Sequence, residues 1–216
     1  MVLEKMDAFF ETRLEGYDEH MLRDISFAKE FYPFTAALLP AEPGAYILDL
    51  GCGTGLELEF YFRRNPEARI KGIDLSRGML DVLESKFADM AIEAVQGSYF
   101  EVPLGECVFD GAVSVESLHH FTPEEKLPLY RKLYAALKPG SSFVLTDYFA
   151  ESEWEAQLYR ATLETLKREQ GIADSDFYHY DTPLTAAKEK QLLEEAGFAV
   201  ETAGKWEATS TLIAKK

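Results

Sequence analysis

The sequence predicts an α/β protein built on a doubly wound, mostly parallel sheet of seven strands. The first observation is that short apolar runs alternate with helical segments from residue 44 to residue 148. This alternation is typical of parallel strands covered by helices on both faces. The second is a glycine-rich turn at residues 51–55, directly after the first apolar run. The third is a pair of short apolar–polar runs at the C-terminus, which predicts that an antiparallel hairpin completes the sheet.

Each strand is expected where an apolar run is bounded by turn residues or charges. The parallel strands are predicted at residues 45–50, 69–74, 91–96, 108–115 and 142–148. The hairpin is predicted from residues 198–203 and 206–214, with Gly204 and Lys205 as its turn. Helices are predicted at residues 54–64, 76–89, 122–138, 151–169 and 185–196.

Capping residues support several of these helix boundaries. Ser76 and Thr185 each precede a predicted helix, and their side chains can accept a hydrogen bond from its first turn. Thr122 is followed by Pro123 and Glu125, which is the pattern of a capping box with proline at the first helical position. Pro128 lies inside the same helix and predicts a kink or a later start.

The charge balance excludes several classes of partner. The chain has 22 basic and 38 acidic side chains, for a formal net charge of −16. This charge would repel nucleic-acid phosphates and anionic membrane surfaces, so neither is expected as a partner. Cys52 and Cys107 are too few for a disulfide framework. Because the start of the chain lacks the apolar core of a signal peptide, a cytoplasmic location is expected.

The glycine turn predicts a cofactor that lies against bare backbone. Gly51, Gly53 and Gly55 follow the first strand, and Asp74 ends the second strand, where an acid can bind the two hydroxyls of a ribose. Dinucleotide enzymes have the spacing Gly-x-Gly-x-x-Gly, which differs from the Gly-x-Gly-x-Gly found here. Asp49 precedes the turn and would repel a pyrophosphate, so the pattern favours a cofactor with a positive end.

Residues 48–55, Leu-Asp-Leu-Gly-Cys-Gly-Thr-Gly, resemble the first motif of the class I S-adenosylmethionine-dependent methyltransferases. The resemblance continues in residues 72–76, 96–99, 109–121 and 137–141, and in the terminal hairpin. It implies a Rossmann-like fold, S-adenosyl-L-methionine as cofactor, and methyl transfer as the reaction. The residues that it places at the cofactor are Tyr17, Asp49, Gly51, Cys52, Gly53, Gly55, Asp74, Leu75, Met79, Ser98, Tyr99 and Val115.

The same resemblance assigns roles within this set. The backbone around Gly51 and Gly53 would pass beneath the methionine part, while Asp74 would hold the ribose. Leu75, Met79, Ser98 and Tyr99 would surround the adenine. Many members of the family have Asp where Ser98 stands, so adenine recognition departs from the common pattern here. Tyr17 is expected to close over the cofactor, with ordinary helix packing as the alternative.

Methyl transfer needs a general base only when the acceptor must lose a proton. Candidates at the mouths of the fourth and fifth strands are Glu116, His119, His120 and Tyr148. Of these, His119, His120 and Tyr148 are the predicted catalytic residues. The two histidines are favoured because imidazole titrates near neutral pH. A structural role, or a role in holding the cofactor, is the alternative for both histidines.

A metal site is the alternative that these side chains leave open. Glu116, Asp147 and His120 could approach one another at the strand ends. Hard cations require several oxygen ligands, and only two acids are available, so no metal is expected.

We expect a single domain over residues 1–216 with four parts. Residues 44–148 form the cofactor-binding core, and residues 185–216 form a terminal helix and hairpin. Residues 1–43, a helical segment interrupted by Pro33, Pro40 and Pro43, and residues 149–184, a helical insert, would serve as lids over an acceptor pocket. Aromatic residues that could line this pocket, or simply pack the insert, are Trp154, Tyr159, Phe177, Tyr178, His179 and Tyr180.

Together these inferences predict transfer of a methyl group to a small molecule. One alternative is a protein that binds S-adenosylmethionine without turnover, as a regulatory or partner subunit. Another is a nicotinamide-dependent dehydrogenase on the same type of sheet, which the glycine spacing and the hairpin disfavour. The sequence leaves open whether the chain forms a homodimer.

Overall fold

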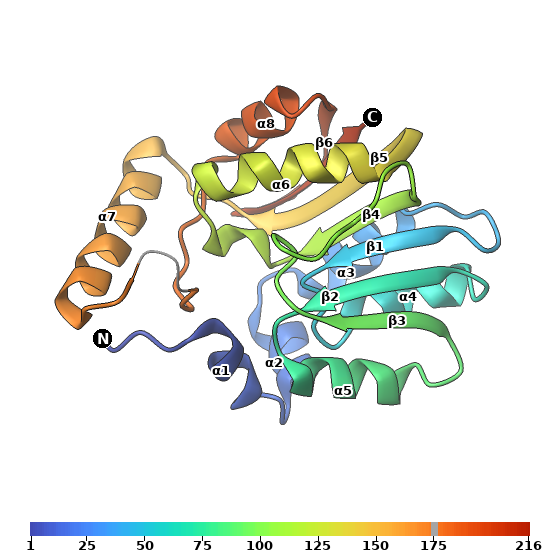
Figure 1. Ribbon diagram of the computed structural model, residues 1–216, viewed down its shortest axis with the longest axis horizontal. Helices are drawn as coiled ribbons and strands as arrows, with labels where there is room; N and C mark the ends of the chain where they lie inside the picture. The colour runs from blue at the N-terminus through green and yellow to red at the C-terminus, as the bar shows by residue number, and fades with distance from the viewer. Residues whose placement is uncertain (174–176) are drawn as a thin grey trace.

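A seven-stranded sheet organises the computed structural model, which describes residues 1–173 and 177–216 (Figure 1). The strands are β1 (Tyr46–Leu50), β2 (Arg69–Asp74), β3 (Ala91–Gln96), β4 (Phe109–Val115), β5 (Leu137–Tyr148), β6 (Ala199–Trp206) and β7 (Thr209–Lys215). Their order in the sheet is β3-β2-β1-β4-β5-β7-β6. β7 runs antiparallel to β5 and β6, while the pairs among β1 to β5 are parallel. The predicted fold class is therefore confirmed.

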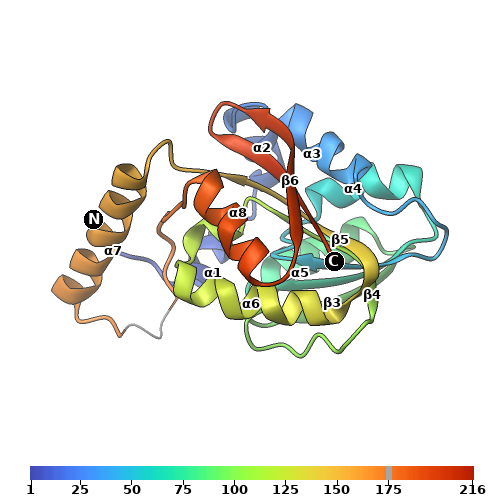
Figure 2. The same cartoon turned by 90° about the horizontal axis from the view of Figure 1, so that it is seen from above.

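Two helical layers cover the sheet (Figure 2). The helices are α1 (Met6–Glu11), α2 (Tyr17–Asp24), α3 (Ala28–Ala37), α4 (Leu56–Arg64), α5 (Arg77–Lys86), the 3-10 helix η1 (Leu118–His120), α6 (Pro123–Ala136), α7 (Glu153–Gln170) and α8 (Ala186–Glu195). Apolar residues of α3, α4 and α5 pack on one face, and those of α6 and α8 on the other. α7 stands apart from the sheet (Figure 1). The central strands β1 and β4 are buried on both faces, as is typical of a parallel sheet between helices, whereas β3 and β6 at the two edges keep exposed positions.

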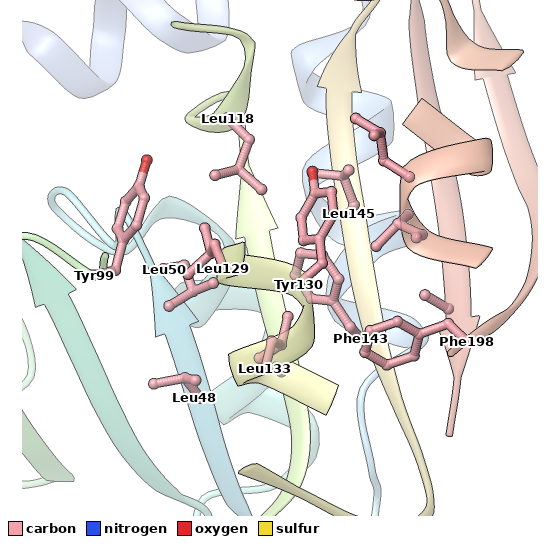
Figure 3. Packing of buried hydrophobic residues seen from close by; sticks show 14 of the residues in the cluster. Leu48, Leu50, Tyr99, Leu118, Leu129, Tyr130, Leu133, Phe143, Leu145 and Phe198 are labelled. Atoms are coloured by element: carbon pink, nitrogen blue, oxygen red, sulfur yellow. The ribbon is translucent and has the colours of Figure 1, made fainter. Parts of the chain in front are cut away.

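The core beneath α6 and α8 is closely packed (Figure 3). Leu50 of β1 and Leu145 of β5, on either side of β4, project toward Leu129 and Leu133 of α6, and all four side chains are buried. Phe198, just before β6, belongs to the same cluster. This packing fixes the carboxyl ends of the strands, where loops carry the polar side chains described below.

The predicted helix caps are confirmed. Ser76 Oγ accepts the N–H of Met79 at 3.1 Å, and Thr185 Oγ1 accepts that of Lys188 at 3.2 Å. Thr122 and Glu125 form the predicted capping box, so α6 begins at Pro123. Pro128 therefore lies inside a helix that does not start later. Pro33 also lies inside a helix, α3, and does not interrupt it as predicted.

The start of β5 and the position of the hairpin turn differ most from the prediction. β5 begins at Leu137, because Leu137 pairs with Phe109 before a register shift brings Ser142 opposite Gly111. The hairpin turn lies at residues 207–208, and Gly204 is inside β6. Gly204 sits at a bulge under the ring of Trp206, which a Cβ would approach to 2.5 Å. The glycine is thus needed for close packing and not for the turn.

No helix within residues 1–173 or 177–216 combines the length and apolar character that crossing a bilayer requires.

Candidate active site

The glycine turn lies at the switch point of the sheet, between β1 and α4. Gly51, Gly53 and Gly55 have φ values of +73°, +47° and +74°, which side chains rarely tolerate. A Cβ at Gly51 would also overlap the side chain of Ser117. The turn thus keeps bare backbone at the place where an open α/β sheet binds its ligand.

Asp74, at the end of β2, is held in place by backbone amides. Its carboxylate accepts the N–H of Gly53 and the N–H of Ser76, each at 2.9 Å. Burial raises the pKa of Asp74, although these hydrogen bonds act in the opposite direction. The side chain is therefore oriented at the turn, as the prediction of a ribose ligand requires.

Two acidic side chains are buried under the turn. Asp49 is 1% exposed and Glu57, in α4, is 4% exposed. Among the described residues, both carboxylate oxygens of Asp49 and Oε1 of Glu57 lack a hydrogen-bond partner. Burial is the main cause that raises the pKa of each acid, and Glu57 raises that of Asp49 further. Such a pair favours a positively charged ligand nearby.

The N-terminal segment covers this region. Glu11 accepts the N–H of Gly78 at 3.0 Å, and Asp18 accepts the hydroxyl of Thr54. Lys86 in α5 binds Asp18 at 2.7 Å. Tyr17 lies between these contacts; burial raises its pKa, and the charge of Asp74 raises it further.

The remaining residues predicted to bind the cofactor lie around the same strand ends. Ser98 is buried, and its Oγ accepts the N–H of Phe100 at 3.3 Å. The Tyr99 hydroxyl lies 3.3 Å from Ser117 Oγ. Leu75 is half-buried, whereas Met79 is 1% exposed and covered by protein. Cys52 and Val115 are also buried.

A cavity of about 850 Å³ opens at the ends of β4 and β5, beside the N-terminal segment that covers the turn. Its wall comes from α1, α2, η1, the end of β5, the loop at residues 179–181 and the β6–β7 turn. All three predicted catalytic residues, His119, His120 and Tyr148, line it. Glu116 and Tyr17 also line the cavity, so it touches all four candidate bases and the N-terminal cover of the turn.

Of the aromatic residues predicted to line the acceptor pocket, His179 alone lines this cavity. Phe177 and Tyr178 line a second cavity of about 340 Å³. Trp154 is 72% exposed on α7, and it is absent from the wall of the larger cavity, as are Tyr159 and Tyr180. Residues that the sequence reasoning missed are Phe9, Phe10, Arg13, Asp181 and Thr209. A lone acid such as Asp181 gives no spacing signal in the sequence, because it reaches the site through a loop.

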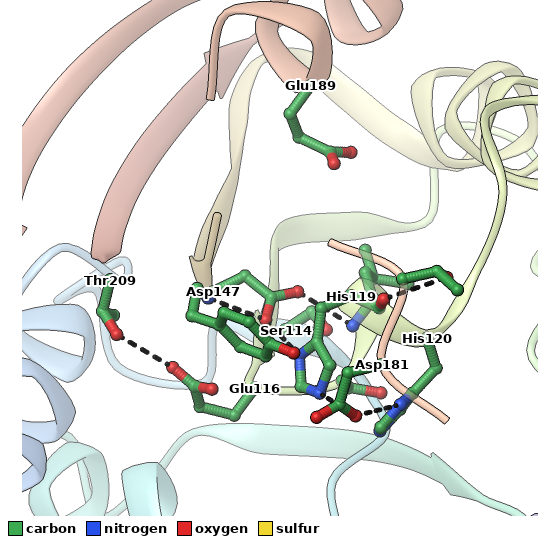
Figure 4. A network of polar contacts seen from close by, with 12 residues as sticks. Ser114, Glu116, His119, His120, Asp147, Asp181, Glu189 and Thr209 are labelled. Atoms are coloured by element: carbon green, nitrogen blue, oxygen red, sulfur yellow. Dashed lines mark hydrogen bonds and ion pairs between the residues drawn. The ribbon is translucent and has the colours of Figure 1, made fainter. Parts of the chain in front are cut away.

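His119 is held by Asp147 (Figure 4). Its Nδ1 lies 2.5 Å from Asp147 Oδ1, and both side chains are buried. Asp147 also accepts the N–H of Leu118 and the N–H of Tyr148, each at 3.0 Å. The other ring nitrogen, Nε2, lies 3.6 Å from Asp181 Oδ1. Asp147 thus fixes the ring so that Nε2 points toward Asp181 and the cavity.

His120 approaches the same carboxylate, with Nδ1 at 3.1 Å from Asp181 Oδ1. Burial opposes protonation of His119, but Asp147, Asp181 and Glu116 outweigh it and raise its pKa to about 9. Burial, followed by the charge of His119, lowers the pKa of His120 to about 4. Burial acts to raise the pKa of Asp181, yet the two histidines hold it well below its usual range.

Glu116 has a backbone φ of +50°, an uncommon conformation for a residue with a side chain. Its Oε1 accepts the hydroxyl of Thr209 at 3.5 Å. Burial and the charge of Asp147 raise its pKa to about 8. Two sets of metal-ligating atoms lie within 4.8 Å here: Glu116, His119 and Asp147, and His119, His120 and Asp181. The alternative ligand set Glu116, Asp147 and His120 is not one of them.

Comparison with known proteins supports the reading of these motifs. The profile of the methyltransferase domain family matches residues 47–140. A carboxy-S-adenosyl-L-methionine synthase from Wolinella succinogenes is 32% identical, over 96% of this chain and 92% of the synthase. The biotin biosynthesis bifunctional protein BioHC of Teredinibacter turnerae is also 32% identical, over 71% of this chain and 26% of that protein.

The fold is shared with solved structures as well. Human N-acetylserotonin methyltransferase, in complex with SAM, superposes with a TM-score of 0.67 at 19% identity, over 97% of this chain and 56% of that one. The match to the methyltransferase domain family and the relative of nearly full length set the dehydrogenase alternative aside. The chain belongs to the class I S-adenosylmethionine-dependent methyltransferases, and S-adenosylmethionine is its cofactor.

Proposed function

We propose that this enzyme transfers the methyl group of S-adenosylmethionine to a small molecule bound in the 850 Å³ cavity. The observation that carries the proposal is the position of this cavity between the ends of β4 and β5 and the cover of the glycine turn. Its volume is typical of sites for small molecules. Aromatic side chains such as Phe9 and Phe10 line it beside titratable ones, which suits a partly apolar acceptor.

We assign the cofactor to the glycine turn. Asp74 would hold the ribose hydroxyls, and the backbone at Gly51 and Gly53 would lie under the methionine part. The buried pair Asp49 and Glu57 would attract the positive charge of the cofactor, since these carboxyls have few other partners. Ser98 and Tyr99 would border the adenine.

His119 is the proposed general base for acceptors that must lose a proton. Its Nδ1 is fixed by Asp147, and Nε2 can accept a proton from the acceptor only when the ring is neutral, so the raised pKa of about 9 predicts faster transfer at alkaline pH. The acceptor atom then forms its bond to the methyl carbon as the carbon–sulfur bond breaks, and the bonding electrons stay on sulfur. Alignment and a dry pocket are what the protein adds to this displacement.

The two predicted lids belong to this proposal. Residues 1–43 would close over the cofactor, as the contacts of Glu11 and Asp18 suggest. Residues 149–184 would close the acceptor side, where His179 and Asp181, from the loop after α7, line the cavity. We treat both as parts of one domain, since their contacts are with the core.

The first experiment is a thermal-shift titration with S-adenosylmethionine and S-adenosylhomocysteine. Stabilisation by both ligands is expected, and its absence would overturn the cofactor assignment. Release of S-adenosylhomocysteine is then measured against a panel of small hydroxylated, amino and thiol compounds. Binding without release for any acceptor would favour the alternative of a binding protein without turnover.

The bound cofactor must also be distinguished from carboxy-S-adenosyl-L-methionine, because a relative of nearly full length is a carboxy-S-adenosyl-L-methionine synthase. A carboxylate beside the methyl carbon would need a cation. Arg13 lines the cavity, but its guanidinium already pairs with Glu4 at 3.1 Å. Mass spectrometry of the cofactor that copurifies with the protein distinguishes the two forms directly.

We also propose a cytoplasmic location, which the free cysteines Cys52 and Cys107 support, since Cys107 is exposed and unpaired. A homodimer is the proposed assembly, with the exposed side chains of Trp154 and Leu158 on α7 as its candidate contact. Light scattering after size-exclusion chromatography tests the dimer, and a monomeric mass would contradict it.

A further inference from the structure

We propose that His119, His120 and Asp181 form a binding site for one divalent transition-metal ion in the wall of the cavity (Figure 4). The two histidines come from η1, and Asp181 comes from the loop before α8. Three segments that are distant in sequence meet here: η1, this loop, and the end of β5, which supplies Asp147 to hold His119.

The separations between the ligand atoms suit a single small ion. Asp181 Oδ1 lies 3.1 Å from His120 Nδ1 and 3.6 Å from His119 Nε2. Ligands at about 2.0–2.1 Å from a tetrahedral Zn²⁺ lie about 3.3–3.4 Å apart. The two measured separations fall on either side of that value, so small adjustments would bring all three atoms into coordination distance.

The hydrogen bonds around the cluster leave these atoms available. His119 Nδ1 is engaged by Asp147, and this is the usual arrangement of a metal-bound histidine, whose second nitrogen donates to a carboxylate. His120 Nδ1 and Asp181 Oδ1 are buried and face each other as an ion pair at 3.1 Å, but among the described residues neither atom makes a hydrogen bond of good geometry. Buried polar atoms without such partners are uncommon and call for a ligand.

The competing set of Glu116, His119 and Asp147 is less suitable. The oxygens of Asp147 already accept two backbone N–H groups and contact His119 Nδ1. Coordination by Asp147 would break those interactions, whereas coordination by Asp181 would break none of them. Two imidazoles and one carboxylate favour ions such as Zn²⁺, Fe²⁺ or Co²⁺ over Mg²⁺, which prefers oxygen ligands.

Three protein ligands leave at least one coordination position open, and all three residues line the cavity. An acceptor hydroxyl or thiol could occupy that position and lose its proton to solvent more readily when bound to the ion. This consequence rests on the proposed methyl transfer, but the metal site itself does not. With the ion bound, Nε2 of His119 is a ligand, so the ion takes the place of His119 as the group that activates the acceptor. The class of acceptor that it favours is a molecule with an oxygen or sulfur donor.

The test is calorimetric titration of the metal-free full chain with ZnCl₂, without cofactor or acceptor. We expect one Zn²⁺ per chain and no binding of Mg²⁺ at this site. Asp181→Asn and His120→Asn should each weaken the affinity by at least about tenfold, since even residues that only orient metal ligands contribute this much. Circular dichroism confirms that each variant is folded.

The matched control is Asp24→Asn. It removes a carboxylate that lies 2.7 Å from His20 Nδ1 on α2, a pair with exposed side chains and outside both ligand sets. Its Zn²⁺ affinity should equal that of the unmodified chain. Failure of the unmodified chain to bind Zn²⁺, or equal binding by Asp181→Asn, would overturn the proposal. Because no methyl transfer is measured, neither result depends on whether the acceptor assignment is right.

Discussion

His119 and Asp147 form a buried pair in which the ring nitrogen Nδ1 lies 2.5 Å from a carboxylate oxygen. The pair joins the 3-10 helix η1 to the end of β5. Backbone N–H groups of Leu118 and Tyr148 hold the same carboxylate, so the imidazole has a fixed direction relative to the sheet. Its free nitrogen therefore faces the cavity whatever ligand is present there.

Replacing Asp147 with Asn should lower the turnover of methyl transfer by about 10²-fold, the contribution of a general base, while leaving cofactor affinity unchanged. The amide has one acceptor oxygen fewer and would face an N–H group, so His119 would lose its orientation. Single-turnover kinetics and calorimetry measure the two quantities. Asp110→Asn, which alters a carboxyl bound to Lys138 near the start of β4, is the control. Unchanged turnover in the Asp147 variant would remove His119 from the mechanism.

Asp74→Ala should weaken S-adenosylmethionine binding by about 1–3 kcal/mol, the cost of leaving hydrogen-bonding groups unpaired. The same change releases the N–H groups of Gly53 and Ser76, so part of the loss comes from the turn itself. Calorimetric titration measures the change. Asp81→Ala, on the exposed side of α5, should bind normally. Equal affinities for the two variants would contradict the ribose assignment.

Cofactor affinity should rise as the pH rises through the range in which the pair of Asp49 and Glu57 loses its proton. Asp49 and Glu57 have raised pKa values, so the ligand-free chain retains a proton on the pair at a pH where free acids are ionised. A cationic cofactor must displace this proton, and that becomes easier as the pH rises. By the same linkage, the free energy of unfolding of the ligand-free chain falls as the pH rises, because the folded state binds more protons than the unfolded one.

Titrations at several pH values, with Asp49→Asn beside Glu67→Gln, test this dependence. The Asp49 variant should bind more weakly and show a flatter pH profile. Glu67 is exposed after α4, and its variant should behave like the unmodified chain. A pH-independent affinity in the unmodified chain would show that the acid pair is ionised before the cofactor binds.

Glu189→Ala should lower the free energy of unfolding by about 3–5 kcal/mol, because it leaves a buried cation unpaired. Lys126 Nζ lies 2.6 Å from Glu189 Oε2, and both side chains are almost completely buried between α6 and α8. The Tyr130 hydroxyl also bonds Glu189. Urea denaturation followed by circular dichroism measures the loss.

Glu195→Ala supplies the comparison, since its 3.2 Å ion pair with Arg131 joins the same two helices at the surface. Exposed pairs of this kind contribute about 0–1 kcal/mol. A similar loss in the two variants would mean that burial is not what makes the Glu189 network important.

Features set by local chemistry could be predicted from the sequence. The bounds of β2 and β3 agree with the structure, because each is a short run of mixed apolar and polar residues set off by turn or helix-capping residues. The capping box at Thr122 is likewise encoded within four residues. The hairpin turn was predicted wrongly, because Gly204 serves the contact with Trp206, which only the folded sheet brings about.

Some residues of the site could likewise be predicted from the sequence, and others could not. His119 and His120 were identifiable because they follow β4 in a recognisable segment, and Asp74 because it ends β2. Asp181 was not, since it approaches the histidines through a loop that follows α7, and no spacing in the sequence encodes that path. The unpaired state of Asp49 likewise depends on what the fold places around it.

The contacts of Glu11 with Gly78 and of Asp18 with Thr54 close the N-terminal segment over the glycine turn. If the cofactor rests on that turn, as proposed above, it can be replaced only after these contacts break, and each catalytic cycle then contains an opening step. Such steps limit the turnover of many enzymes. The segment therefore sets a ceiling on speed that is common to every acceptor, and a more reactive acceptor would not exceed it.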